Sequence, residues 1–168
     1  MKRRLLLGSA AAAALLATGC AAPGNGAPAA AGSGSPRTEW NGRLSLRVDS
    51  ATPQNFAALF ELRGSPRAGE LILTSPIGST LGVLRWSPGR ATLQNGRDIH
   101  EFDSVDALSE AATGAAIPIE ALFGWLQGRA QEASGWHANL SQVADGRLQA
   151  TRQTPQPTAE LRVIFDVP

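Results

Sequence analysis

The sequence predicts an α+β domain, in which an antiparallel β-sheet carries a pair of helices on one face. From residue 43 to residue 94, apolar side chains alternate with polar ones, and short turns rich in Gly and Pro separate the alternating runs. Between residues 103 and 128 the apolar spacing changes to three and four, and the alternation then returns. Strands, a helical insert and further strands are typical of an antiparallel sheet with its helices on one side.

The first half of the domain is predicted to be a meander of short antiparallel strands. Gly, Pro and Ser clusters at residues 64–69, 75–79 and 87–89 mark the turns, and Asn95-Gly96 is a strong signal for a tight hairpin. Between these turns the expected strands cover residues 43–49, 56–62, 70–75, 80–86 and 91–94.

The helical insert is predicted to contain two helices. Asp103 and Ser104 are good N-cap residues for a helix over residues 105–112, and Pro118 suits the first turn of a second one. Gly128 is expected to end the second helix, whose apolar residues share one face: Ile119, Leu122, Phe123 and Leu126. The expected strands after the insert cover residues 136–140, 148–153 and 161–167.

Whether the helices cover a cavity or pack directly on the sheet depends on the curvature of the sheet. If the sheet curls, the helices would form a lid over an apolar interior, which is a natural container for an acyl chain. A fully packed core fits the same pattern equally well. In either case, large aromatic residues are expected in the core or the cavity wall, and the chain has four tryptophans: Trp40, Trp86, Trp125 and Trp136.

The N-terminus has the layout of a secretory signal. Three basic residues, at positions 2–4, precede an apolar run from Leu5 to Ala17, which is too short to span a membrane. Ala17-Thr18-Gly19 leads directly into Cys20, the one cysteine of the chain, and resembles the lipobox of bacterial lipoproteins. Residues 1–19 are therefore expected to be a lipoprotein signal peptide, cleaved before a lipidated Cys20. The Arg3-Arg4 pair lacks the twin-arginine consensus, which favours the general secretory route.

After Cys20, residues 21–38 are mostly Ala, Gly, Pro and Ser, a composition that predicts a flexible linker. Residues 20–38 are thus the lipidated cysteine and its linker, and residues 39–168 form one domain. By resemblance to bacterial lipoprotein sorting, Ala21 in place of Asp implies transfer to the outer membrane. The expected location is the periplasmic face of that membrane, where the protein is held by its lipid anchor.

Composition argues against several functions. Without residues 1–19 the chain has 12 Arg, no Lys and 14 acidic residues, and its net charge of −2 does not suggest a nucleic-acid partner. His100 and His137 are far apart and have no metal-ligand spacing, and the chain has no Gly-x-Ser-x-Gly motif or phosphate loop. We therefore expect no enzymatic activity, no metal and no cofactor, and a monomeric protein.

Three segments of the domain resemble the LolB family of outer-membrane lipoprotein receptors. Trp40 with residues 42–47 is similar to the family's opening strand, and residues 71–80 are similar to its second strand and following loop. Residues 114–128 are similar to its helical stretch. The resemblance implies an incomplete antiparallel β-barrel with a helical lid over an apolar cavity. It also implies that the cavity accepts lipoprotein acyl chains from the periplasmic carrier LolA and releases them into the inner leaflet of the outer membrane.

The resemblance also implies roles for individual residues. Ile77, between Pro76 and Gly78, occupies the position of a family Leu that projects from the loop and promotes delivery into the membrane, although an Ile in a turn can also pack back onto the sheet. The residues expected to face the acyl-chain cavity are Leu44, Leu46, Phe56, Phe60, Leu71, Leu73, Leu122 and Leu126. The alternative is a tethered lipoprotein of similar fold that binds another amphiphile or acts as a scaffold.

Overall fold

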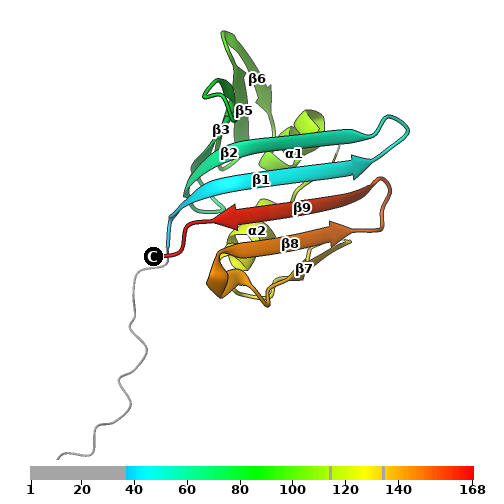
Figure 1. Cartoon of the computed structure of the whole chain (residues 1–168). Coiled ribbons are helices and arrows are strands. Elements are labelled where there is room, and N and C mark those ends of the chain that lie inside the picture. The colour runs from blue at the N-terminus through cyan, green and yellow to red at the C-terminus, as the bar shows by residue number, and fades with distance from the viewer. Residues whose placement is uncertain (1–36, 114, 134) are drawn as a thin grey trace, which may run out of the picture. The chain divides into compact units, whose positions relative to one another are not determined.

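A computed structural model describes residues 37–113, 115–133 and 135–168. The predicted signal peptide, Cys20 and most of the predicted linker lie outside these residues. In the described part, nine strands form one sheet in the order β6-β5-β4-β3-β2-β1-β9-β8-β7, with every neighbouring pair antiparallel (Figure 1). Their bounds are β1 Glu39–Asp49, β2 Gln54–Gly64, β3 Gly69–Thr74, β4 Thr80–Ser87, β5 Arg90–Asn95, β6 Asp98–Phe102, β7 Trp136–Asn139, β8 Arg147–Arg152 and β9 Thr158–Phe165.

The sheet is assembled from two meanders that meet at its centre. Strands β1 to β6 follow one another as hairpins, and β7 to β9 form a second set. The final strand returns beside the first, so that Leu46 of β1 lies level with Phe56 of β2 and Leu161 of β9. Because β9 pairs with β1, the first and last strands of the domain lie side by side.

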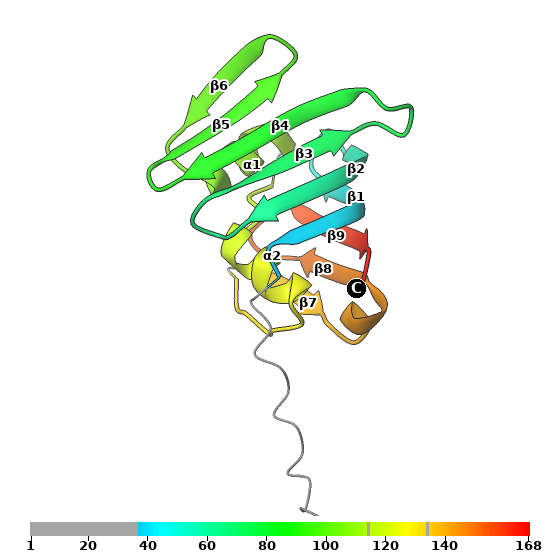
Figure 2. The ribbon, with the colours of Figure 1, turned by 90° about the vertical axis from the view of Figure 1, so that its left-hand side faces the viewer.

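Two helices lie on the concave side of the sheet: α1, Val105–Thr113, and α2, Ile119–Leu126 (Figures 1 and 2). Along most of the strands the side chains alternate between the two faces, as the sequence predicted. On β1, for example, Leu46 and Val48 are buried under the helices, whereas Arg43 and Arg47 are exposed on the outer face. The apolar inner face and the helices together form the core.

All four tryptophans are buried, as expected, and three of them donate an indole N–H to a backbone carbonyl. Trp86 donates to Ser65, Trp125 to Gln131 and Trp136 to Ala116, at 2.9–3.0 Å. Such bonds remove most of the cost of burying a polar atom. They fix the orientations of these three rings.

The elements agree with the sequence prediction except at a few boundaries. The final strand ends at Phe165, and Val167, which was expected to belong to it, is exposed. Leu140 lies just outside β7, and Pro118 is the N-cap of α2 rather than a residue of its first turn, because its backbone is extended. The hairpin at Asn95-Gly96 is confirmed, and its second strand is β6.

Gly42 allows β1 and β9 to approach closely. A Cβ atom at this position would lie 2.0 Å from the carbonyl oxygen of Ile164 and 2.8 Å from the Cα of Phe165, both in the backbone of β9. Gly42→Ala must therefore push the two strands apart, and we expect it to lower the free energy of unfolding by about 3 kcal/mol in urea titrations.

Gly89→Ala is the control for this substitution. Gly89 has a φ of 74°, but a Cβ atom at this position would meet nothing within 4 Å, so the cost of the substitution is backbone strain alone, about 1 kcal/mol. Equal losses for the two variants would contradict the close approach at Gly42.

Candidate functional site

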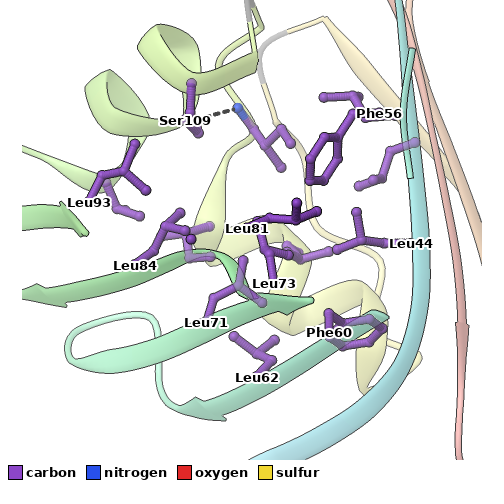
Figure 3. A pocket seen from close by; sticks show the side chains of 18 of the residues that line it. Leu44, Phe56, Phe60, Leu62, Leu71, Leu73, Leu81, Leu84, Leu93 and Ser109 are labelled. Atoms are coloured by element: carbon purple, nitrogen blue, oxygen red, sulfur yellow. Dashed lines mark hydrogen bonds between the residues drawn. The ribbon is translucent and has the colours of Figure 1, made fainter. Parts of the chain in front are cut away.

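A pocket of about 280 Å³ lies between the inner face of the sheet and the two helices (Figure 3). None of its lining residues carries a charge, and nearly all are aliphatic or aromatic. The strands contribute Leu44, Leu46, Phe56, Phe60, Leu62, Leu71, Leu73, Leu81, Gly82, Leu84, Trp86, Leu93, Asn95, Leu161 and Val163. The helices and the segment between them contribute Val105, Ser109, Ala112, Ile117, Ile119, Leu122 and Leu126.

The structure brings together all eight residues that the sequence suggested for an acyl-chain cavity. Leu44, Leu46, Phe56 and Phe60 come from β1 and β2, Leu71 and Leu73 from β3, and Leu122 and Leu126 from α2. Their contact with an acyl chain stays a prediction. The other lining residues were not singled out, although Leu84, Trp86, Leu161 and Val163 follow the same alternation that identified the first six.

Ser109 is a polar residue in this apolar lining, and its hydroxyl is engaged. The Oγ atom donates to the backbone oxygen of Asp106 at 2.9 Å. It accepts from the backbone N–H of Ile117, also at 2.9 Å (Figure 3). The second bond connects α1 to the segment that leads into α2. Ser109 thus holds the two helices in one arrangement above the pocket, a role that no sequence motif indicated.

The β3–β4 loop lies at the rim of the pocket. Leu73 and Leu81, which flank this loop, both belong to the pocket lining. At the tip of the loop the Ile77 side chain is 90% exposed, so it does not pack back onto the sheet. Ile77 is therefore a solvent-exposed apolar side chain next to the opening of an apolar pocket.

Chemically, this arrangement can hold an apolar chain but offers no reactive group. The pocket lining contains no acid, base or thiol. Among the described residues, no group of His, Cys, Asp and Glu is placed to hold a metal ion, and no helix is long and apolar enough to cross a membrane. Binding in the pocket would therefore depend on buried apolar surface.

Ser109→Ala tests the connection between the helices. The substitution removes the acceptor for the Ile117 N–H inside a buried region, which typically costs about 1–2 kcal/mol. We expect that loss in the free energy of unfolding, measured by urea titration. Ser45→Ala, on the outer face of β1, is the control and should change stability by less than about 0.5 kcal/mol. Identical stability of the two variants would contradict the role of Ser109.

Comparison with known proteins identifies the family. The family model described as "Outer membrane lipoprotein LolB" matches residues 37–164. Curated relatives named outer-membrane lipoprotein LolB include that of Bordetella petrii, 29% identical over 148 residues, which are 74% of this chain and 74% of the relative. That of Cupriavidus pinatubonensis is 34% identical over 83% of this chain and 67% of its own length. That of Chromobacterium violaceum is 29% identical over 86% of each chain. The chain belongs to the LolB family.

Proposed function

We propose that this protein accepts lipoproteins from a LolA-type periplasmic carrier, binds their acyl chains in the pocket, and inserts them into the inner leaflet of the outer membrane. The observation that carries the proposal is the uncharged pocket beneath two helices, with an exposed isoleucine at its rim. Membership of the LolB family supports the same assignment. The protein itself is proposed to be anchored to the outer membrane through Cys20, on the periplasmic side.

The chemistry of the pocket suits an acyl chain. A saturated chain cannot form hydrogen bonds, so it would strip water from any charged group in the pocket without replacing it. This lining has no charged groups, so binding the chain carries no such cost. Each buried methylene contributes about 0.8 kcal/mol. Nearly all of the residues that line the pocket are apolar, so a methylene that enters it is removed from water. Binding of this kind needs neither a nucleotide nor covalent chemistry.

The position of Ile77 supports the release step. Burying an isoleucine side chain in a bilayer gains about 1.5–3 kcal/mol, which is enough to favour membrane contact without anchoring the domain. Because Leu73 and Leu81 connect the loop to the pocket, contact at Ile77 would bring the mouth of the pocket to the lipid surface. An acyl chain leaving the pocket would then meet the bilayer first.

The receptor activity is tested by transfer in solution. The chain carrying Cys20→Ser, which removes the predicted lipidation site, is mixed with a carrier loaded with labelled lipoprotein and recovered through an affinity tag. We expect the label to move from the carrier to this protein. A folded protein that gains no label would contradict the proposal and would favour another amphiphile or a scaffolding role.

Ile77→Glu tests the release step separately. We expect uptake from the carrier to be unchanged and delivery into phospholipid vesicles to slow by about 10- to 100-fold, the equivalent of the apolar transfer energy that is lost. Ile164→Glu is the matched control, because Ile164 is an exposed isoleucine on the outer face of β9. Delivery at the normal rate by Ile77→Glu would refute the role of the loop.

A further inference from the structure

The outer face of the sheet is apolar next to the β3–β4 loop. Ile72 of β3 lies opposite Val83 of β4, and the same row continues through Gln94 of β5 to Ile99 of β6. On the β2 side the apolar row ends at Glu61, which lies opposite Ile72. Ile72 and Val83 are half-buried, and Ile99 is 61% exposed. These side chains point away from the pocket, so packing of the core does not explain them.

The next row of the outer face, two residues further from the loop, is charged. Glu70 of β3 and Arg85 of β4 form an ion pair at 2.6 Å, and Arg63 lies beside Glu70 on β2. Toward β6 the same row continues from Arg85 to Thr92 of β5 and Glu101 of β6. Glu101 forms an ion pair with Arg90. Because a strand rises about 3.3 Å per residue, the outer face changes from apolar to charged within about 7 Å.

The inner face of the same hairpin is also apolar up to this boundary. Leu71, Leu73, Leu81 and Leu84 line the pocket, and no residue from 71 to 84 carries a charge. The part of the hairpin beyond the Glu70–Arg85 pair, residues 71–84, is therefore uncharged on both faces and at its tip. We call this part the distal hairpin; it projects to one side of the sheet at its loop (Figure 2).

The loop at the tip satisfies most of its own backbone donors. The N–H of Ser75 donates to the backbone oxygen of Ser79, that of Gly78 to the backbone oxygen of Ser75, and that of Ser79 to the Ser75 hydroxyl, at 2.8–3.0 Å. Pro76 has no N–H to satisfy. Each backbone group that is already paired avoids the cost of losing water in a low-dielectric environment.

We propose that the loop end of the distal hairpin, with Val83 on its outer face and not only Ile77, enters the lipid interface, and that the Glu70–Arg85 pair stays outside the apolar layer. This inference rests on the proposed function and extends it from one residue to a surface. Val83 lies three residues from the base of the loop at Thr80, about 10 Å along the strand, and Arg85 lies about 16 Å from it, whereas interfacial elements typically penetrate about 5–10 Å. Val83 therefore lies at the limit of the apolar layer, and the Glu70–Arg85 pair stays outside it.

A bilayer fits this surface better than a protein partner does. Lipids can surround the exposed tip and the adjoining outer face together, whereas a folded partner would cover one of them. Residues 71–84 carry no charge, so they have no group that could pair with a charged protein surface. For the same reason, moving them into lipid does not require burying a charge. Arg97 in the β5–β6 turn and Asp98, the first residue of β6, limit the apolar surface beside Ile99.

Penetration depth gives a direct test. In the Cys20→Ser chain, single cysteines introduced as Ile77→Cys, Val83→Cys, Arg85→Cys and Ala57→Cys carry a polarity-sensitive fluorophore and are mixed with phosphatidylcholine vesicles. We expect blue-shifted emission at positions 77 and 83, and no shift at position 85 or at position 57, which lies on the outer face of β2. A shift at position 77 without one at position 83 would confine contact to the loop and overturn the inference.

Delivery gives the functional test. Val83→Glu, and Thr80→Glu as an exposed alternative that cannot disturb packing, should slow delivery into vesicles about tenfold while uptake from the carrier is unchanged. Ser45→Glu, half-buried on the outer face of β1, is the matched control.

The outcomes separate this inference from the proposed function. Normal delivery by the folded Val83 and Thr80 variants, together with slow delivery by Ile77→Glu, would overturn the inference alone. Reduced uptake with normal delivery would show that the distal hairpin docks the carrier, which also overturns it. If the unsubstituted protein takes up no lipoprotein, the proposed function fails, and the fluorescence result still decides membrane contact.

Discussion

Phe123 of α2 packs edge-on against Trp40 and Trp86, and the position of the pocket depends on this contact. The ring centroids are 5.4 and 6.3 Å apart, with interplanar angles of 83° and 69°. Trp40 lies near the start of β1 and Trp86 near the end of β4, so the three rings fix α2 over one end of the concave face. The pocket lies between the helices held in this way and the inner face of the sheet, and both helices contribute residues to its lining.

The alternation along the strands predicted which residues lie on the inner face of the sheet. It did not predict which of them line the pocket and which pack in the core. Leu46 and Val48 belong to the same strand and the same face, and both are almost fully buried, yet only Leu46 is in the pocket lining. On α2, Leu122 lines the pocket while the adjacent Phe123 fills the core. A period identifies a face, whereas the difference between lining and packing depends on where the helices settle, which is a tertiary property.

Two features of the site had no signal in the sequence. Leu73 lies opposite Gly82 and Thr74 opposite Thr80, so the register shifts and Leu81 has no partner of its own. Such a bulge re-aims side chains, and here Leu81 joins the pocket lining instead of the outer face. Ser109 likewise matches no motif, because its importance comes from a bond to Ile117, eight residues away across the connection between the helices.

The size of the pocket bears on how a receptor of this kind can both accept and release its cargo. Each methylene that the pocket encloses would contribute about 0.8 kcal/mol to binding, so binding strengthens with the length of chain enclosed. A bilayer covers the whole of every chain and therefore stabilises the same lipid more strongly. A pocket that enclosed complete chains would compete with the membrane and slow release, whereas a partial pocket keeps the final step downhill. Under the proposed function, incomplete enclosure of the acyl chains is thus a requirement of delivery.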